Sequence, residues 1–362
     1  MYSFHLFSIK KITANIQFCQ WKISRYFINI SAQNIAEYRL RKGFDFMAVN
    51  RVKTVILGAG NVGAAVAHGL ALEKLCGEIV MLDINREKAW AEAEDLKHAL
   101  SAERSSIRVK SGGYEECADA DIAILTAAPK YIPGQSRPDM VAKAAKITEE
   151  VIPHVMTRGF KGFFIVVTNP VDVISNLVQK LSGLPPYRII GTGTSLDTAR
   201  LKIYIAEKLN VDPMSVNAFC MGEHGDSQVI PWSLATVGSK PFAEVVRDNP
   251  DRLKHFDRQT ALQEIKDVAF DIVNRKGSTT FGIASAACSI VSAIVNDSRT
   301  VIPVSAWLNG EYGEGNIYAG VPAVIGMEGV KELVEYNLAS DEIAAFRHSV
   351  SLIREYGRKI GL

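Results

Sequence analysis

From Val52 onward, short apolar runs alternate with longer segments in which apolar and polar residues are mixed. Val52–Leu57 is rich in β-branched residues, which indicates a strand, and Gly63–Glu73 after it has a helix-like pattern. The further strands that we expect are Glu78–Leu82, Ala120–Thr126, Gly162–Thr168 and Arg188–Gly191, and the further helices are Glu87–Leu100, Val141–Thr157, Val171–Leu181 and Thr198–Leu209. Short apolar strands that alternate with helices are typical of parallel βαβ units. The pattern therefore predicts an α/β fold with a doubly wound parallel sheet.

The alternation loosens after about residue 210, where glycine, proline and other turn-forming residues become more frequent. Strand-like pieces lie near Val301–Leu308 and Asn316–Pro322, and a long helical pattern from Asp257 to Ser292 breaks at Lys276–Gly277. This pattern predicts an α+β domain after the parallel sheet. We place the boundary near Gly191 and expect two domains, at residues 47–190 and 191–362.

The first 46 residues differ from the rest of the chain. They contain seven Lys or Arg residues, two acids (Glu37 and Asp45) and many aromatics, with no steady helical or strand period. We expect Met47 to be the true first residue and residues 1–46 to lie outside the fold. A targeting segment, which would also be basic and acid-poor, and an ordered structural arm are the alternatives.

Composition mainly excludes classes of protein. Hydrophobic residues make up 48% of the 362 residues and charged residues 22%, an ordinary globular balance. The absence of an uninterrupted apolar run of about 18 residues argues against a membrane span, and a net charge of +2 argues against a nucleic-acid surface. The cysteines are odd in number, scattered, and form no CxxC pair or zinc-like cluster, so we expect no metal and a reducing, cytoplasmic location; they are Cys19, Cys76, Cys117, Cys220 and Cys288.

The stretch VILGAGNVGAAVAHGL places a GxGxxG pattern where a strand gives way to a helix. Gly58 would allow a tight turn, Gly60 would let a pyrophosphate approach the backbone, and Gly63 would let the helix lie close to the sheet. Asp83, 20 residues after Gly63, ends the next strand and can accept hydrogen bonds from a ribose diol. This context predicts a Rossmann domain that binds NAD rather than NADP, and the residues expected to bind the cofactor are Gly58, Gly60, Asn61, Val62, Gly63, Asp83 and Asn169.

Three later motifs carry groups suited to chemistry: TNPVD, LDTAR and GEHGD. Asn169 follows a strand end, where loops of such sheets meet ligands. Asp197 and Arg200 lie three apart at a probable helix start and so project from nearly one face. His224 lies between two glycines in a tight turn. Arg137 lies in a loop that is rich in glycine and proline.

With these motifs, the chain resembles the L-lactate/malate dehydrogenase family, and more narrowly the L-2-hydroxyisocaproate dehydrogenases of lactic acid bacteria. The resemblance is carried by GNVGAAVAHGL, NPVDVI, GTGTSLDTAR and GEHGDSQ, and it extends from about Val52 to the C-terminus. It implies a reversible, NAD-dependent L-2-hydroxy acid dehydrogenase that assembles as a homo-oligomer, commonly a tetramer.

The resemblance also implies a role for each residue. His224 would donate and accept the proton, because an imidazole titrates near neutral pH, and Asp197 would orient it and stabilise its protonated form. Arg200 would bind the substrate carboxylate through a guanidinium fork. Arg137, on a closing loop, would polarise the keto oxygen, and Asn169 would donate a hydrogen bond near the carbonyl and the nicotinamide.

The loop AAPKYIPGQSR bears on the substrate side chain. In the resembled family the residue six before the loop arginine faces that side chain, as Gln in lactate enzymes and as Arg in malate enzymes. Here it is Tyr131, followed by Ile132, and Thr279 matches another position of the same pocket. An apolar pocket disfavours a dicarboxylate because an unpaired buried charge is costly. We therefore expect keto acids with apolar side chains, with pyruvate still possible and Lys130 as the residue that could admit oxaloacetate.

Each of these residues also has an ordinary structural interpretation. His224 could be a loop histidine, Asp197 and Arg200 an exposed ion pair worth under about 1 kcal/mol, and Arg137 a solvated loop charge. Asp172 is expected to cap or brace its turn rather than to take part in catalysis. At the level of the whole protein, the alternatives are a malate dehydrogenase and a non-catalytic NAD-binding protein on the same fold.

Overall fold

The computed structural model describes residues 52–103, 105–129 and 137–362, and the side chains of residues 137 and 138 are not among the described parts. The chain divides into two units, Met1–Met47 and Ala48–Leu362, and every described residue belongs to the second. The predictions for residues 1–46 and for Tyr131 therefore lie outside the described residues.

The predicted parallel sheet is confirmed. Its six strands are β1 (Lys53–Leu57), β2 (Glu78–Leu82), β3 (Arg108–Ser111), β4 (Ile122–Leu125), β5 (Phe163–Val166) and β6 (Ile189–Gly191). They pair in the order β3-β2-β1-β4-β5-β6, the order of a Rossmann domain, and each pair is parallel. The central strands are buried along their whole length, as expected for a parallel sheet with helices on both faces.

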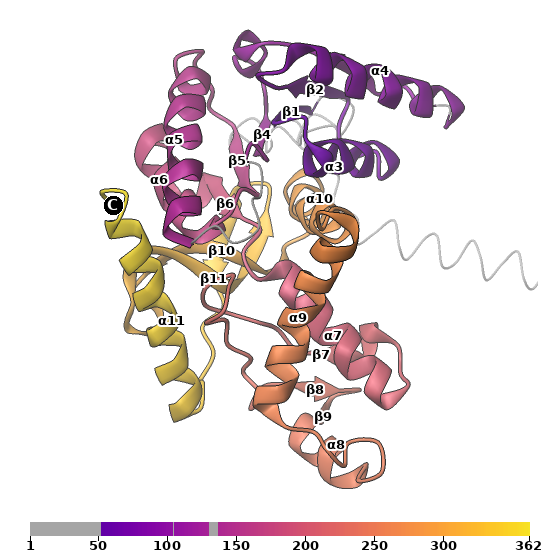
Figure 1. Ribbon diagram of the computed structural model, residues 1–362, viewed down its shortest axis with the longest axis vertical. Helices are drawn as coiled ribbons and strands as arrows, with labels where there is room; N and C mark the ends of the chain where they lie inside the picture. The colour runs from indigo at the N-terminus through magenta and orange to yellow at the C-terminus, as the bar shows by residue number, and fades with distance from the viewer. Residues whose placement is uncertain (1–51, 104, 130–136) are drawn as a thin grey trace, which may run out of the picture. The chain divides into compact units, whose positions relative to one another are not determined.

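The helices of this half follow the predicted alternation. They are α3 (Asn61–Leu72), α4 (Arg86–Ala102), α5 (Arg137–Met156), α6 (Val171–Ser182) and α7 (Ser195–Leu209). Figure 1 shows α3 and α4 together on one side of the sheet and α5 and α6 on the other. The strand β3 was not predicted, because a short edge strand with polar residues such as Arg108 and Lys110 lacks the apolar run of the central strands.

The second half continues the same sheet. β10 (Thr300–Asn309), β11 (Gly315–Gly326) and β12 (Gly329–Leu333) are antiparallel, and β10 joins β6 where Ser305 pairs with Gly191. The two strands predicted near residues 301–308 and 316–322 are thus confirmed as β10 and β11. A separate small sheet contains β7 (Val216–Asn217), β8 (Thr236–Val237) and β9 (Lys240–Pro241).

Four helices complete the described chain: α8 (Phe242–Asp248), α9 (Arg258–Lys276), α10 (Phe281–Val295) and α11 (Ser340–Arg358). The expected break in the long helical pattern occurs at Gly277, which has a φ of +89°, and α9 and α10 are bent by 118° relative to each other. Short 3₁₀ turns lie at Tyr114–Cys117, Pro186–Arg188, Pro213–Ser215 and Glu311–Gly313.

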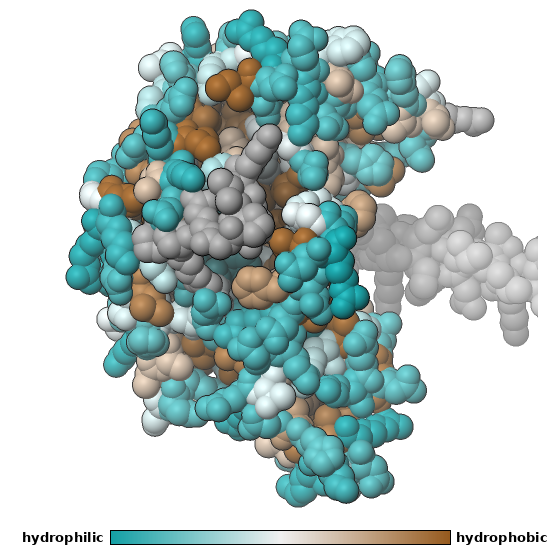
Figure 2. Space-filling view, viewed as in Figure 1, coloured by the Kyte–Doolittle hydropathy of each residue, from teal (hydrophilic) through white to brown (hydrophobic). Residues whose placement is uncertain are grey.

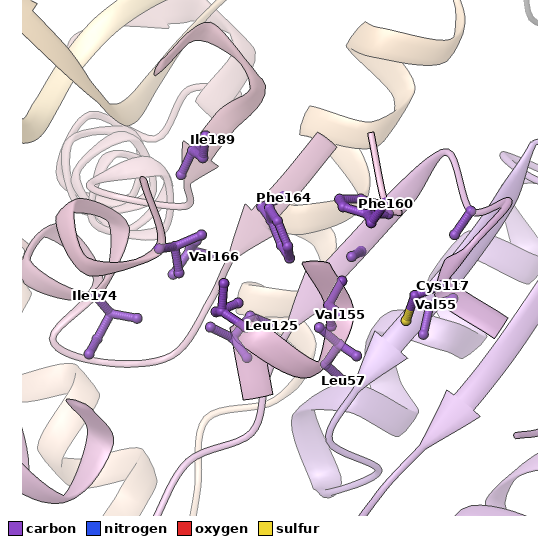
Figure 3. Packing of buried hydrophobic residues seen from close by; sticks show 14 of the residues in the cluster. Val55, Leu57, Cys117, Leu125, Val155, Phe160, Phe164, Val166, Ile174 and Ile189 are labelled. Carbon is purple, nitrogen blue, oxygen red and sulfur yellow. The ribbon is translucent and has the colours of Figure 1, made fainter. Parts of the chain in front are cut away.

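Among the described residues, two hydrophobic cores hold these layers. The first lies between the parallel sheet and α5 and α6, where Phe160 and Phe164 pack with ring centroids 4.8 Å apart near Leu125 and Val155 (Figure 3). The second joins α7, α9 and the small sheet around Trp232. The carboxyl ends of β1, β4 and β5 therefore form a rigid edge from which the candidate site is built.

Candidate active site

The glycine turn after β1 has steric reasons for two of its three glycines. Gly58 has a φ of +115°, and a Cβ there would meet the backbone nitrogen of Ala127 at 2.6 Å. A Cβ on Gly63 would meet the carbonyl oxygen of Gly58 at 2.0 Å, so α3 can lie this close to the turn only with glycine. A Cβ on Gly60 would meet nothing within 4 Å, so open space lies in front of this residue.

The surroundings of this turn fit a dinucleotide. In the described chain, the N-terminus of α3 has no side-chain cap, and it therefore offers backbone N–H groups and the positive end of the helix dipole. Asp83 lies beside the turn, where one carboxylate oxygen accepts from the backbone N–H of Ala59 (2.7 Å) and the other from that of Asn85 (2.8 Å). Carboxylate oxygens have further lone pairs for a ribose diol and would repel a 2′-phosphate.

Backbone contacts link the glycine turn to the end of β5. The N–H of Ala127 donates to the carbonyl oxygen of Leu57 (2.7 Å), and the hydroxyl of Thr168 donates to the carbonyl oxygen of Ala127 (2.9 Å). Thr168 is followed by Asn169. Asn169 therefore lies just after β5, at the same edge of the sheet as the glycine turn after β1. It also lines the cavity described below.

A second group of side chains forms around the start of α7. Asp197 accepts from Arg200 Nη1 (3.0 Å) through one carboxylate oxygen, and its other oxygen lies 2.5 Å from His224 Nδ1. The side chains of Asp197, Arg200 and His224 are 6%, 12% and 24% exposed. Because both members of the Asp197–Arg200 pair are largely buried, the interpretation as an exposed ion pair is wrong.

The proximity of these groups shifts their titration. Burial by itself lowers the pKa of His224, but the negative charge and hydrogen bond of Asp197 outweigh burial and raise this pKa above its ordinary value. Burial raises the pKa of Asp197, but His224 and Arg200 outweigh burial and lower it below its ordinary value. The carboxylate therefore stays ionised, and the imidazole keeps its proton to a higher pH than an isolated histidine.

The main chain of His224 is held by a buried carboxyl group from α6. Asp172 accepts from the backbone N–H of His224 (2.9 Å) and from the hydroxyl of Ser305 (2.6 Å). Burial raises the pKa of Asp172 to about 6, although both hydrogen bonds act in the opposite direction. The expectation that Asp172 caps or braces its own turn is therefore wrong: its carboxylate braces the turn that carries His224, 52 residues further along the chain.

A cavity of about 240 Å³ opens beside this group. Four of the predicted residues line it: Asn169, Asp197, Arg200 and His224. Thr279 is half-buried between α9 and α10 and is not part of the lining. Arg137 is the first residue of α5, but its side chain, like all of Tyr131, lies outside the described parts.

Sequence reasoning missed much of the cavity wall. The additional lining residues come from α5 (Met140 and Val141), from the chain on either side of His224 (Glu223, Gly225, Asp226 and Gln228) and from α9 (Lys266, Ala269 and Phe270), together with Pro170 and Tyr356. The spacing of Lys266, Ala269 and Phe270, three and four residues apart, marks one helix face and is the signal that could have found them. Phe270 lines the cavity and is 56% exposed.

Two further observations concern what the described residues lack. No group of three or more His, Cys, Asp and Glu side chains in the described ranges is arranged to hold a metal ion. Within the same ranges, no single helix is long and apolar enough to cross a membrane; the bent pair α9 and α10 reaches that length and composition only when both helices are taken together.

Comparison with known proteins gives matches over most of the chain. Residues 52–191 match the family model of the lactate/malate dehydrogenase NAD-binding domain, and residues 194–359 match that of the lactate/malate dehydrogenase α/β C-terminal domain. L-lactate dehydrogenase 3 of Bacillus cereus is 44% identical over 315 residues, which are 87% of this chain and 100% of that protein.

Solved structures agree with these matches. The minor L-lactate dehydrogenase from Enterococcus mundtii, in its ligands-bound form, is similar with a TM-score of 0.83 at 42% identity, over 86% of this chain and 99% of that one. Malate dehydrogenase from Cryptosporidium parvum is similar with a TM-score of 0.81 at 29% identity, over 86% and 99% of the two chains.

Proposed function

Because the chain belongs to the lactate/malate dehydrogenase family, we propose that it catalyses the reversible, NAD-dependent reduction of a 2-keto acid to an L-2-hydroxy acid. The observation that carries this proposal is the largely buried group of His224, Asp197 and Arg200 in the wall of one cavity with Asn169. A non-catalytic NAD-binding protein would have no need of an imidazole and a guanidinium that both contact one buried carboxylate.

His224 supplies the proton in the reduction. Its Nδ1 is engaged by Asp197, so Nε2 is the ring nitrogen left to donate to the keto oxygen. Asp197 stabilises the imidazolium before transfer and fixes the orientation of the ring. In the oxidation direction the neutral imidazole accepts the proton of the hydroxyl group, so one residue serves both directions.

Arg200 binds the substrate carboxylate. Its Nη1 is used by Asp197, and the other N–H groups of the guanidinium form a planar fork that suits a carboxylate. We assign Asn169 to a hydrogen bond at the substrate carbonyl, and Arg137, at the start of α5, to polarisation of the same oxygen. With the imidazole protonated, the contact group of Asp197, Arg200 and His224 has one negative and two positive charges, which suits a substrate carboxylate at Arg200.

The residues expected to hold NAD are Gly58, Gly60, Asn61, Val62, Gly63 and Asp83. Bound there, NADH would supply the hydride in the reduction and NAD⁺ would accept it in the oxidation. The open space before Gly60 and the uncapped start of α3 suit the pyrophosphate, and Asp83 suits the ribose diol.

The substrate side chain is proposed to be apolar, as in the hydroxyisocaproate enzymes that the sequence resembles. Met140, Val141, Ala269 and Phe270 provide apolar surface in the cavity. Tyr131 and Thr279 stay predictions for the same pocket. An apolar pocket separates related side chains by only about 1–3 kcal/mol per methylene, so pyruvate is included among the substrates.

A second candidate substrate, oxaloacetate, is favoured by one observation. Lys266 brings an ammonium group to the cavity wall, where it could pair with a second carboxylate. Its Nζ already donates to the carbonyl oxygen of Asp226 (2.8 Å). Two facts weigh against oxaloacetate: this bond already occupies Lys266, and the relatives named L-lactate dehydrogenase are more similar to this chain, at 44% and 42% identity, than the malate dehydrogenase at 29%.

The test is a substrate panel with NADH: pyruvate, 2-ketoisocaproate, phenylpyruvate and oxaloacetate. We expect kcat/KM for 2-ketoisocaproate or phenylpyruvate to exceed that for oxaloacetate, and His224→Gln to abolish turnover of all four. The highest kcat/KM with oxaloacetate would reject the apolar substrate, whereas full activity of His224→Gln would reject the catalytic assignment itself.

The remaining proposals concern organisation. We keep 47–190 as the NAD-binding domain and 191–362 as the catalytic domain, and we propose a cytoplasmic homotetramer. The cysteines among the described residues are all free and buried, which suits a reducing compartment. Figure 2 shows a mostly hydrophilic surface with separate hydrophobic patches, and exposed apolar side chains such as Ile203, Val268 and Phe281 suit burial between subunits. Light scattering of the purified protein tests the tetramer directly.

A further inference from the structure

The turn that carries His224 is held through three successive backbone N–H groups, each bonded to a different element. The N–H of Gly222 donates to the carbonyl oxygen of Gly320 on β11 (2.8 Å), and the N–H of Gly320 donates to the carbonyl oxygen of Gly222 (2.8 Å). The N–H of Glu223 donates to Ser349 Oγ on α11 (2.7 Å), and that of His224 donates to Asp172 on α6 (2.9 Å). The position of the imidazole is therefore set by a sheet strand and two helices that are remote in sequence.

Ser349 contacts this turn through its side-chain hydroxyl. It is fully buried, and its hydroxyl also lies 2.9 Å from the hydroxyl of Ser227, which in turn donates to the carboxylate of Glu223 (2.5 Å). Gly222 has a φ of +88°, and a Cβ there would meet Ser349 Oγ at 2.5 Å. The glycine thus permits both the backbone conformation and the close approach of the serine.

We propose that Ser349 is a positioning residue for proton transfer: its hydroxyl holds the peptide of Glu223 and so sets the place of the His224 imidazole against Asp197. This inference depends on the proposed role of His224. Ser349 is not part of the cavity lining, so it acts on the reaction only through the turn.

The physical reason lies in the cost of an unpaired buried N–H. Without the hydroxyl of Ser349, the N–H of Glu223 is left without its partner, and the turn must shift to find another. The imidazole lies only 2.5 Å from Asp197, and hydrogen bonds weaken steeply as distance and angle depart from their optimum. A small displacement of the turn therefore weakens the contact that keeps the ring protonated and oriented.

The pH dependence of turnover reports this contact. The charged groups that act on His224 are Asp197 and Arg200 from α7 and Asp172 from α6. Glu223 and Asp226 from its own turn and Lys266 from α9 line the same cavity. Of these, Asp197 is the carboxylate in direct contact with the ring. A weaker contact between Asp197 and the imidazole therefore lowers the pH at which the imidazole loses its proton.

The experiment compares Ser349→Ala with Ser351→Ala in the full-length protein. Ser351 lies on the same helix but is exposed, and its hydroxyl donates only to the carbonyl oxygen of His348 in its own helix (2.6 Å). We measure kcat and KM for pyruvate with NADH across the neutral and alkaline range, the dissociation constant of NADH, and Tm.

For Ser349→Ala we expect kcat/KM to fall about tenfold or more, mainly through kcat, and its alkaline limb to move to lower pH. The dissociation constant of NADH should stay within about twofold, and Ser351→Ala should match the parent protein. An unchanged alkaline limb and kcat in Ser349→Ala would overturn the proposal, even if Tm falls, because that result assigns the serine to stability alone.

Two further variants keep the test decisive. If Ser349→Ala does not fold, Ser349→Cys keeps a side chain of similar shape but offers the N–H of Glu223 a much weaker acceptor, and we expect a smaller shift of the alkaline limb in the same direction. No shift in Ser349→Cys would then count against the proposal. His224→Gln separates the two hypotheses: its inactivity together with a normal Ser349→Ala refutes only the positioning role, whereas its full activity refutes the proposed function.

Discussion

Replacing Asp197 by Asn tests the electrostatic core of the site, because the change keeps the shape of the side chain while it removes the negative charge and turns one of the two acceptor oxygens into an NH2 donor. In the parent protein the carboxylate lies 2.5 Å from His224 Nδ1 and 3.0 Å from Arg200 Nη1, and its side chain is 6% exposed. Hydrogen bonds to charged groups contribute about 1.5–3 kcal/mol each. With a tenfold change in rate for about 1.4 kcal/mol, loss of the bond to the imidazolium predicts a fall in kcat/KM of roughly 10- to 150-fold.

The sign of the pH effect follows from the protonation state that each direction needs. Reduction of a keto acid needs the imidazolium of His224, so kcat/KM falls as pH rises through its pKa. In Asp197→Asn, burial, which lowers this pKa, is no longer outweighed by the carboxylate. The fall should therefore begin at a lower pH than in the parent protein, and oxidation of the hydroxy acid, which needs the neutral ring, should reach its plateau at a lower pH.

The assay measures the steady-state oxidation of NADH by pyruvate at a series of pH values. The dissociation constant of NADH is measured for each variant, so that the cofactor is kept at a saturating concentration. Asp212→Asn is the matched control, because Asp212 is exposed and its carboxylate accepts, within the described chain, only from the backbone N–H of Met214 (2.7 Å). An Asp197→Asn variant with kcat/KM within twofold of the parent and an unmoved alkaline limb would refute the reasoning.

Three more predictions follow from individual contacts. Arg200→Lys should raise KM for pyruvate by about 100-fold with a smaller effect on NADH binding, because an ammonium cannot reproduce a two-pronged bond to a carboxylate; equal effects on both ligands would contradict the assignment. Gly63→Ala should lower Tm and abolish NADH binding, since its Cβ would meet the carbonyl oxygen of Gly58 at 2.0 Å. Gly60→Ala should keep Tm and weaken only NADH binding, because its Cβ enters open space. Calorimetry measures the first effect and NADH titration the second, and equal losses of Tm in the two variants would count against this geometry. Burial raises the pKa of Asp172 to about 6, so folding favours its protonated form. The free energy of unfolding should therefore decrease by roughly 3 kcal/mol as pH rises from about 3 to 7, and Asp172→Asn should lose this pH-dependent decrease. Denaturant unfolding of Asp172→Asn with the same pH slope as the parent protein would disprove it.

Local pattern was sufficient for much of this protein. Buried parallel strands are continuous apolar runs, so β1, β2, β4, β5 and β6 could be predicted from hydropathy alone, as could the helices between them. The spacing of Gly58, Gly60 and Gly63 identified the turn, because a positive φ and a close helix–strand approach are local demands on the backbone. Asp197 and Arg200 could be paired because they are three residues apart on one helix.

Contacts between distant segments could not be predicted in this way. The antiparallel strand β10 joins the parallel sheet through Ser305 and Gly191, which are separated by more than a hundred residues, and no periodicity records that pairing. The edge strand β3 was missed because its exposed, polar residues lack the apolar signal. The spacing of Lys266, Ala269 and Phe270 marks one face of α9, but only the tertiary structure brings that face to the same cavity as Asp197 and Arg200.

The sequence by itself determined which groups are present: a glycine turn, an acid after the second strand, an imidazole between glycines, and an acid and a guanidinium one helical turn apart. Only the tertiary structure decided how those groups act, because burial and proximity, not identity, set the pKa of His224 and the environment of Asp197. The peptide of Glu223 bonds to Ser349 across 126 residues, and that of His224 to Asp172 across 52. Such distances are closed by the packing of α6 and α11 against the sheet, which is the physical reason that the position of the imidazole is a property of the whole fold.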